Sequence, residues 1–523
     1  MRKRALICFL VCIVLFFVSV LRVATIATTD FSQVSNIKNG IRLKISNSRG
    51  TIYDRNRVRL TNSEKKIVAC VSPTPRAITA ISKVLKGDDL QKVLNGLKTN
   101  KPVICEVPEK INCDGIICTT IYTDEDTPSR HIIGYTDSEN KGVSGIERAY
   151  DTLLFSENEI SVFYNTDAKG RILEGIEPEI TNDNRAATHG VVTTLDINIQ
   201  TIAEECAESL EKGAVIVADL KGKIRASVSR PSFERNNVGI YLESENSPLL
   251  NRAINAYNVG SVFKPCVAAS GIEKGIHNFS YTCTGSCEII DRFFKCHNLE
   301  GHGPLDLRGA LAQSCNTFFY NFAFEISGNE ILKTAKALNF GQSLKLCEGI
   351  YTAQGNLPKK ENLANIAHLA NFSIGQGELL LSPISILTLY CAIASNGEYY
   401  LPSLVEGTIE NGKYSEYDIG LPTKVFNDNT AKVLREYLIS VINEGTAENA
   451  KPKTVTAAGK TATAQTGKYR NGREICEGWF CGFFPAENPQ YVAVIFSEDD
   501  QKQTLSCGEI FSILADKITS LKI

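Results

Sequence analysis

The sequence predicts a mixed α and β chain that ends in an α/β domain, with a smaller α+β domain ahead of it. Three observations predict this organisation. Strand patterns occur at both ends of a helical block in the second half of the chain, short irregular elements fill the first part, and an apolar run opens the chain. We therefore expect a tail at 1–4, a transmembrane anchor at 5–27, an N-terminal α+β domain at 28–180 and a C-terminal domain at 181–523.

Composition limits the possible partners of the chain. The 523 residues are 43% hydrophobic, which is enough for two sizeable cores beyond the anchor. The formal net charge of −2 removes any strong argument for a nucleic-acid partner.

The first 27 residues have the pattern of a membrane anchor. Met1-Arg2-Lys3-Arg4 precedes an apolar run from Ala5 to Leu21, which extends past Arg22 to Ala27. Such a run is about long enough to span a bilayer, and the basic cluster favours a cytoplasmic N-terminus. We expect a single-pass protein of the cell membrane whose bulk lies outside. The competing interpretation is a cleaved signal peptide, because Thr25-Ile26-Ala27 offers small residues for processing.

The expected N-terminal domain begins with a strand at 41–48, followed by a strand and turn at 49–56 and a helix at 83–98. No catalytic grouping is visible in it.

The C-terminal domain has a more regular pattern. We expect a helix at 197–210, strands at 214–218 and 224–228, helices between 261 and 396, strands at 456–465, 478–484 and 491–497, and a final helix at 509–522. Strands that flank a helical block predict one sheet whose members are far apart in sequence.

The 17 cysteines allow either disulfides or free thiols. Cys283, Cys287, Cys296 and His297 resemble part of a zinc site, but the adjacent Cys-His pair lacks the usual ligand spacer. The spacing therefore favours a bridge between Cys283 and Cys296, and we expect no metal and no other cofactor.

Three short motifs carry the chemistry. They are Ser261-Val262-Phe263-Lys264, Ser314-Cys315-Asn316 and Lys460-Thr461-Ala462. Ser-x-x-Lys also occurs from Ser35 to Lys38 and from Ser63 to Lys66, so context must decide. Only Ser261 follows a glycine and opens an apolar run that ends near Gly271 and Gly275, which predicts a short buried helix. Lys264 then lies one turn from Ser261 on the same face.

This placement suits nucleophilic catalysis. A serine hydroxyl is a weak nucleophile, and a lysine can take its proton if burial and nearby positive charge lower the lysine pKa. Lys460 would supply that charge. Two plainer interpretations stay open: Asn316 caps a helix that begins near Thr317, and Thr461 is an ordinary strand threonine.

The ordered motifs resemble those of class B penicillin-binding proteins, the monofunctional peptidoglycan transpeptidases. Further matching segments are Arg49-Gly50 through Asn56, His131 to Tyr135, Gly142 to Glu147, Gly301-His302-Gly303, Gly375-Gln376-Gly377, Gly445-Thr446-Ala447 and Trp479-Phe480. The resemblance implies a penicillin-binding/β-lactamase-like transpeptidase domain, an antiparallel sheet covered by helices, on an N-terminal pedestal of the dimerisation type.

The resemblance also implies a role for each site residue. Ser261 would attack the D-Ala-D-Ala end of a stem peptide, with Lys264 as base and Ser314 as proton relay. Asn316 would bind the donor peptide, Lys460 and Thr461 its carboxylate, and the backbone of Ser261 and Thr463 the oxyanion. Ala462 stands where the family has glycine, and we expect its Cβ to crowd the strand edge.

The implied partners are stem peptides, β-lactams, the membrane and a separate glycan-polymerising glycosyltransferase. Two alternatives remain: a D,D-carboxypeptidase or β-lactamase, and a β-lactam-binding morphogenetic scaffold with little turnover. The motifs favour no one role among elongation, division and sporulation.

Overall fold

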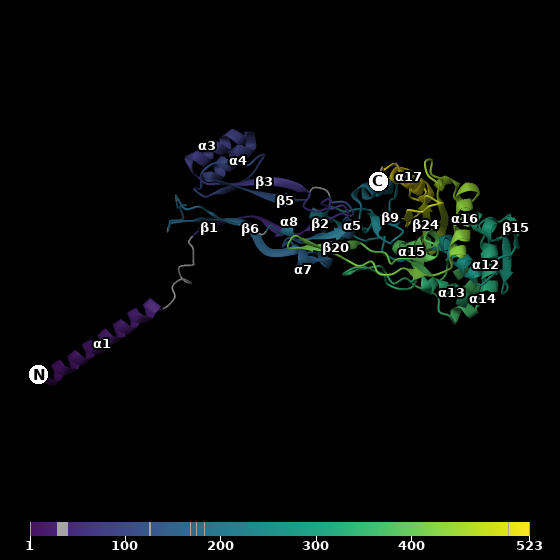
Figure 1. Cartoon of the computed structure of the whole chain (residues 1–523), viewed down its shortest axis with the longest axis horizontal. Coiled ribbons are helices and arrows are strands. Elements are labelled where there is room, and N and C mark those ends of the chain that lie inside the picture. Colours follow the sequence, from purple (N-terminus) through teal and green to yellow (C-terminus); the bar gives the residue numbers. More distant parts are fainter. Residues whose placement is uncertain are drawn as a thin grey trace. The chain divides into compact units, whose positions relative to one another are not determined.

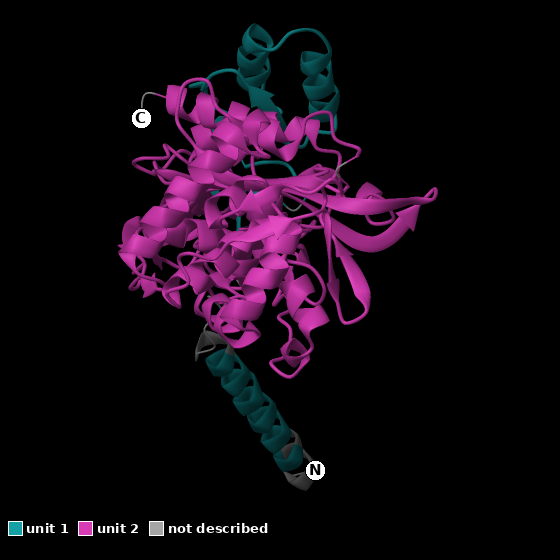
Figure 2. Cartoon of the chain, turned by 90° about the vertical axis from the view of Figure 1, so that its right-hand side faces the viewer, with its two compact units in different colours: residues 1–47, 66–121, 158–183 teal, residues 48–65, 122–157, 184–523 magenta. Residues whose placement is uncertain are grey.

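The computed structural model describes residues 2–28, 40–124, 127–167, 169–173, 175–182, 184–499 and 501–521. The chain forms two compact units that alternate along the sequence (Figure 2). Unit 1 comprises residues 1–47, 66–121 and 158–183, and unit 2 comprises residues 48–65, 122–157 and 184–523. The sequence predicts one domain boundary near residue 180, whereas in the structure the chain passes back and forth between the two units, each of which is built from three segments. Met1 of the expected tail and residues 29–39 of the expected pedestal lie outside the described residues.

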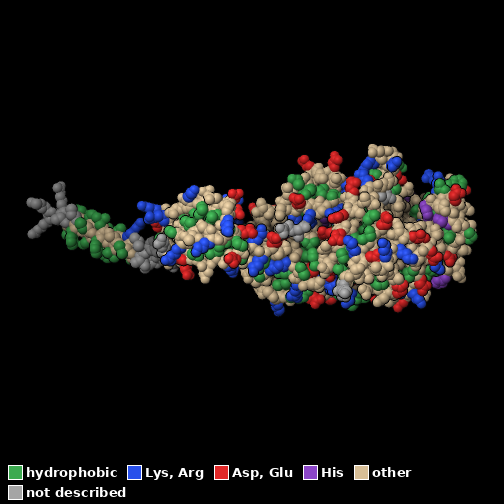
Figure 3. Space-filling view, turned by 90° about the horizontal axis from the view of Figure 1, so that it is seen from above, with side chains coloured by type: hydrophobic (Ala, Val, Ile, Leu, Met, Phe, Trp, Pro, Cys, Tyr) green, Lys and Arg blue, Asp and Glu red, His purple; other side chains and the backbone are tan. Residues whose placement is uncertain are grey.

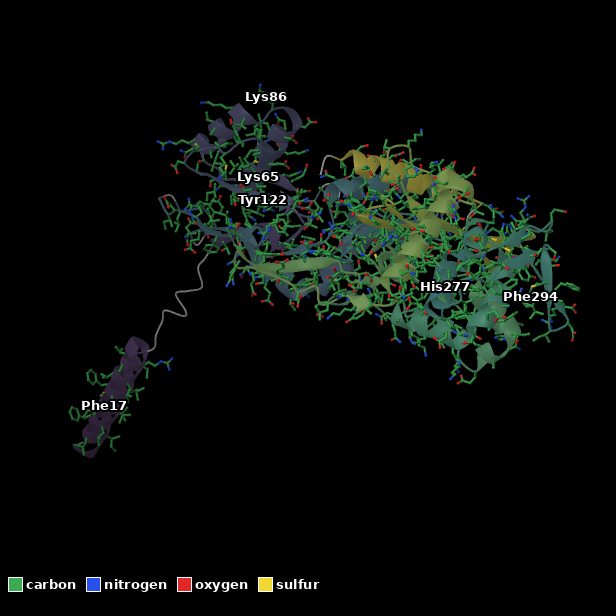
Figure 4. The ribbon with its side chains drawn as sticks, turned by 45° about the vertical axis from the view of Figure 1, so that its right-hand side comes forward. Phe17, Lys65, Lys86, Tyr122, His277 and Phe294 are labelled. Carbon is green, nitrogen blue, oxygen red and sulfur yellow. The ribbon has the colours of Figure 1, made fainter. Side chains whose placement is uncertain are left out.

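Helix α1 (Arg2–Thr28) covers the segment expected to be an anchor. Its described side chains are largely exposed and hydrophobic, as Figure 3 shows, and Phe17, labelled in Figure 4, is one of them. Among the residues that the structure describes, no helix has the length and hydropathy that crossing a bilayer requires. The anchor at 5–27 therefore stays a prediction.

Unit 1 contains a three-stranded sheet in the order β4 (Val103–Val107), β3 (Glu64–Val71) and β5 (Ile116–Thr123). Helices α3 (Pro75–Val84) and α4 (Gly87–Leu97) pack on it through a small apolar core. The single helix expected at 83–98 is wrong at its start, because α3 ends at Val84 and a new helix begins at Gly87. A second sheet has the order β1 (Gly40–Arg49), β6 (Phe155–Asn165) and β7 (Glu179–Thr181).

The five-stranded antiparallel sheet of unit 2 confirms the sheet predicted from strands distant in sequence (Figure 1). Its order is β10 (Ile224–Arg230), β9 (Gly213–Asp219), β25 (Tyr491–Ser497), β24 (Arg473–Phe484) and β23 (Ala458–Arg470). The last strand, β23, carries the Lys-Thr motif and has no neighbour on its outer side within this sheet. Half of its backbone donors and acceptors are therefore open to a ligand.

Helices cover both faces of this sheet. Phe480 packs against Phe511 of α17 (Cys507–Ser520), with ring centroids 4.4 Å apart. The next residue, Cys481, interacts with Tyr390 of α15 (Pro383–Ala394), whose residues are all buried. Successive residues of a strand point to opposite faces, so α17 and α15 lie on opposite sides of β24. Helix α9 (Ile197–Cys206) packs beside α17.

Six further helices of unit 2 pack on one another around the first two motifs. They are α10 (Lys264–Glu273), α11 (Leu307–Ala312), α12 (Asn316–Ile326), α13 (Gly328–Ala337), α14 (Ile366–Ser373) and α16 (Asp428–Glu444). Helix α16 also packs on β23. The short strands β12 (Tyr281–Cys283), β13 (Ser286–Ile289), β14 (Arg292–Lys295) and β15 (Gly303–Leu305) form two ladders between α10 and α11. Phe294, labelled in Figure 4, lies on β14.

A buried ion-pair network joins the early motifs within unit 2. Arg49 Nε lies 2.6 Å from Glu147 Oε2, and Arg235 Nη2 lies 2.9 Å from Glu147 Oε1. Arg235 also pairs with Asp124 at 2.7 Å. Near this network, β2 (Thr51–Tyr53) pairs in parallel with β8 (Gly190–Thr193). The Arg49-Gly50 and Gly145-Ile146-Glu147 segments therefore have a structural role, which explains why no catalytic grouping is visible in them.

Candidate active site

Ser261 lies on a 3-10 turn, η3 (Gly260–Phe263), directly ahead of α10. The sequence predicts one helix from Ser261, whereas the α-helix begins at Lys264, and Pro265 occupies its first turn, where a missing N–H costs nothing. Gly260 has φ +64°, and a Cβ there would lie 3.1 Å from Ala464 Cβ and 3.3 Å from Ala462 Cβ. Glycine thus allows the turn to sit against β23, and the half-buried Ser261 follows it.

Lys264 is fully buried, and its amine contacts the second motif. Its Nζ donates to the Ser314 carbonyl at 2.6 Å and to Asn316 Oδ1 at 2.8 Å, and lies 3.3 Å from Ser314 Oγ. The Phe319 ring centroid lies 5.4 Å away. Two motifs that are 50 residues apart in sequence therefore meet at one nitrogen.

The turn between α11 and α12 presents Ser314 to that nitrogen. Ser314 has a left-handed φ of +52°, and its N–H bonds to the Leu311 carbonyl at 3.2 Å. Cys315 N–H bonds to the Ala310 carbonyl at 2.9 Å, which closes the turn. Helix α12 begins at Asn316 without a side-chain cap, so the amide of Asn316 serves Lys264 and not the helix terminus.

Strand β23 places the third motif. Lys460 and Ala462 are buried, whereas Thr461 is partly exposed and Thr463 is exposed. Because side chains alternate along a strand, Lys460 and Ala462 share the face covered by η3, and Thr461 and Thr463 share the other. The Cβ of Ala462 packs toward Gly260, beneath the serine turn, and not at the open strand edge.

Both lysines have lowered pKa values because burial disfavours an ammonium ion. Burial lowers the pKa of Lys264 to about 7, while Cys315 and Cys296 act in the opposite direction. Burial also lowers the pKa of Lys460 well below its usual range, and the charge of Lys264 lowers it further. Since this repulsion is mutual, the pair favours a state in which at least one amine is neutral.

The structure brings Lys264, Ser314 and Asn316 into contact, and Lys460, which precedes Thr461 on β23, lies close enough for the charge of Lys264 to lower its pKa. Ser261 is half-buried one turn before Lys264, and Thr463 is exposed on β23. The competing Ser63 lies ahead of β3, where residues three apart do not share a face. The segment from Ser35 to Lys38 lies outside the described residues.

Sequence reasoning missed two neighbours of the site. Thr446 Oγ1 lies 3.3 Å from Thr461 Oγ1, and its Gly-Thr-Ala segment was the available signal. Glu477 accepts from the Asn258 N–H at 2.8 Å, and Trp479 Nε1 donates to the Asn258 carbonyl at 2.9 Å. An acidic residue beside a tryptophan in an apolar strand was the signal there. Burial raises the pKa of Glu477 to about 7.

The bridge expected between Cys283 and Cys296 is absent, because both are free thiols. Cys296 Sγ instead lies 3.9 Å from Cys315 Sγ and 3.6 Å from His302 Nδ1. The sulfur of Cys296 therefore contacts more than one side chain and forms no disulfide.

A half-buried serine one turn from a buried amine, beside the free edge of a helix-covered antiparallel sheet, defines the class of active-serine acyl-transfer domains. Residues 213–515 match the family described as the penicillin binding protein transpeptidase domain. The chain belongs to this family, and the resemblance to class B penicillin-binding proteins is confirmed.

Curated relatives extend the similarity beyond that domain. Stage V sporulation protein D of Bacillus subtilis is 28% identical over 506 residues, covering 88% of this chain and 75% of the relative. The peptidoglycan D,D-transpeptidase MrdA of Acinetobacter baumannii is 25% identical over 548 aligned residues, covering 90% of this chain and 80% of the relative.

Solved structures show the same fold. Penicillin binding protein 3 of Mycobacterium tuberculosis, complexed with ampicillin, aligns with a TM-score of 0.67 at 20% identity, covering 91% of this chain and 95% of the other. Penicillin-binding protein 2 of Helicobacter pylori, in complex with MreC, aligns with a TM-score of 0.65 at 22% identity, covering 92% and 99%. The penicillin-binding transpeptidase fold expected from the sequence is thereby confirmed.

Proposed function

We propose that this chain is a peptidoglycan D,D-transpeptidase that cross-links stem peptides through an acyl-enzyme on Ser261. One observation carries the proposal: the buried amine of Lys264 contacts Ser314 and Asn316 within a domain of the penicillin-binding transpeptidase family. The names of MrdA and of the ampicillin-bound relative support the substrate and the inhibitor class.

The contacts of Lys264 fit a neutral base. A neutral amine has two N–H donors and one lone pair. Its two shorter hydrogen bonds, to the Ser314 carbonyl and Asn316 Oδ1, use both donors. The lone pair is then free for a hydroxyl proton, either directly from Ser261 or through Ser314 Oγ at 3.3 Å.

The proposed reaction has two halves. The Ser261 oxygen attacks the penultimate D-Ala carbonyl while its proton passes to Lys264, and backbone N–H groups of Ser261 and Thr463 receive the oxyanion. Ser314 returns the proton to the departing D-Ala amine. An amine from a second strand then displaces the ester, and Lys264 passes a proton from that amine to the departing Ser261 oxygen, which restores the hydroxyl. Lys460 and Thr461 bind the terminal carboxylate of the donor, and Asn316 binds its amide.

Covalent labelling tests the nucleophile. We expect Ser261→Ala to abolish labelling of the purified full chain by a fluorescent penicillin, and Ser63→Ala to leave it unchanged. Peptide mapping of the labelled chain should place the adduct on the segment that contains Ser261. Equal labelling of the Ser261→Ala chain would contradict the assignment.

A donor pentapeptide with an amine acceptor tests the reaction. Cross-linked product supports transpeptidation. Release of D-Ala without transfer identifies a carboxypeptidase, and slow acylation with no product identifies a β-lactam receptor with little turnover.

The membrane location is a proposal that rests on the sequence. The basic residues 2–4 and the apolar run at 5–27 support an uncleaved anchor with the rest of the chain outside the cytoplasm. We expect the chain to stay in the membrane fraction after alkaline carbonate washing and to keep its N-terminal residues. Loss of those residues on N-terminal sequencing would identify a processed signal peptide.

A glycan-polymerising glycosyltransferase is the proposed partner, because the matched domain acts on peptides and not on glycan strands. The complex of the Helicobacter pylori relative with MreC supports a role for protein partners in this family. Cross-linking in membranes followed by mass spectrometry would identify the polymerase.

A further inference from the structure

Three thiols and one imidazole converge beside the proposed active site. The ligand atoms of Cys283, Cys296, His302 and Cys315 all lie within 4.8 Å of one another. They come from four places in the chain: the end of β12, the residue after β14, the residue before β15 and the residue before α12. The fold thus assembles one group from residues spread over the segment between α10 and α12.

The distances match those of a tetrahedral metal site. Zinc–sulfur and zinc–nitrogen bond lengths imply about 3.8 Å between two sulfur ligands and about 3.6 Å between sulfur and nitrogen. Cys296 Sγ lies 3.9 Å from Cys315 Sγ and 3.6 Å from His302 Nδ1. A disulfide would require about 2.0 Å between two sulfurs.

Other polar groups also lie at the sulfurs. Thr317 Oγ1 lies 3.4 Å from Cys315 Sγ, and His297 Nδ1 lies 3.9 Å from Cys296 Sγ. Hydrogen-bond donors at a sulfur stabilise the thiolate, the form in which cysteine binds a metal. Buried cysteines often act only as small apolar side chains, but Cys296 and Cys315 have polar contacts of this kind.

The loop around the cluster is closed by tight backbone contacts. A Cβ on Gly301, with φ +83°, would lie 2.3 Å from the Cys283 carbonyl oxygen, so this approach requires glycine. The Cys296 N–H bonds to the Gly285 carbonyl at 2.8 Å. These contacts hold Cys283, Cys296 and His302 on one side of the cluster, and Cys315 faces them from the turn before α12.

We propose that Cys283, Cys296, His302 and Cys315 bind one zinc ion as a structural site. Three thiolates and an imidazole are donors that suit zinc and not magnesium or calcium. Four protein ligands fill a tetrahedral coordination sphere and leave no position for a substrate. On binding, the thiols release their protons to solvent, and the neutral imidazole donates the lone pair of Nδ1.

The site would stabilise the second catalytic motif. Cys315 lies between Ser314 and Asn316, and both of these contact Lys264 Nζ. Zinc would tie their turn to the two ladders formed by β12 to β15. The metal would therefore act on acylation as a positioning element, without touching substrate.

Metal analysis of the full chain tests the proposal independently of the transpeptidase activity. We expect about one zinc per chain by mass spectrometry after purification in metal-free buffer, and loss of that zinc in Cys315→Ser and in His302→Ala. Matched controls are Cys287→Ser and the exposed His277→Ala, which lie outside the group and should keep the metal. No zinc in the unmodified chain, or zinc retained by Cys315→Ser and His302→Ala together, would overturn the proposal.

Cobalt substitution keeps the test valid if a variant fails to fold. The unmodified chain reconstituted with Co²⁺ should show the visible bands of a tetrahedral ion and the near-ultraviolet bands of thiolate ligation. The spectrum of an octahedral, sulfur-free ion would contradict the site. A thiol reagent provides a further measurement: three thiols should become reactive when a chelator removes the metal, and unchanged reactivity would count against the site.

Discussion

Two of the places where unit 2 buries cations differ in how the charge is met, because only the ion-pair network supplies carboxylates. Arg49 and Arg235 are matched by the carboxylates of Glu147 and Asp124. Lys264 and Lys460 are fully buried, and among the described residues neither forms an ion pair with a carboxylate. Burial costs a charge several kcal/mol unless it is paired, so the two regions meet this cost differently.

The difference separates a structural role from a chemical one. Paired arginines stay charged and join segments of the chain. Burial lowers the pKa of the unpaired lysines, and for Lys264 this gives a neutral amine that can act as a base, at the expense of stability. A buried amine without an acid is therefore a better sign of catalysis in this chain than the number of buried charges.

The largest expected effect comes from Lys264→Met, which keeps the volume and removes the amine. The rate of labelling by a fluorescent penicillin should fall by about 10² to 10⁴-fold, the usual contribution of a general base. The thermal unfolding midpoint should stay equal or rise, because a buried polar group is lost. The exposed Lys333→Met is the control. A clearly lower midpoint for Lys264→Met would remove the distinction between the two regions.

Glu147→Gln should have the opposite effects. The substitution removes the carboxylate charge that Arg49 and Arg235 share. Loss of one member of a buried ion pair typically costs about 3–5 kcal/mol of stability. The expected result is a lower unfolding midpoint by circular dichroism, with a normal labelling rate at low temperature. Glu139→Gln, at an exposed pair with Lys141, should change neither quantity. An unchanged midpoint for Glu147→Gln would show that the arginine network contributes little.

The smallest effect is the pH dependence of acylation. Only the neutral amine of Lys264 accepts the serine proton, and burial lowers its pKa to about 7. The labelling rate should therefore rise about tenfold per pH unit below that pKa and level off above it. Lys460, Cys296 and Cys315 are the titratable groups that act on Lys264. A rate that is constant through neutral pH would exclude Lys264 as the base.

Sequence patterns predicted the five-stranded sheet of unit 2 because its strands are apolar runs with recognisable ends. β9, β24 and β25 consist mostly of buried residues, so each strand could be recognised without its neighbours. The unit boundaries could not be found in this way. They depend on pairings such as Thr51 with Gly190, which join segments whose local patterns are unremarkable.

The active-site motifs were recognisable because the chemistry fixes residue type and short spacing. The contact of Lys264 with Asn316 was not, since a helix N-terminus offers an asparagine an equally good local role. The cysteine cluster was missed for a related reason. His302 and Cys315 stand 6 and 19 residues after Cys296 in the chain, and only the turn before α12 brings them to it.

Because each unit is built from three separate segments of the chain, unit 2 cannot be separated from unit 1 by shortening the protein at a single boundary. A polypeptide that starts at residue 184 would contain the whole family domain but lose β2, Arg49 and Glu147 from its own unit. β8 would then have an uncovered edge, and Arg235 would lack both carboxylates. Such a polypeptide is prone to aggregate through that edge, so recombinant work on the catalytic half should retain residues 48–65 and 122–157.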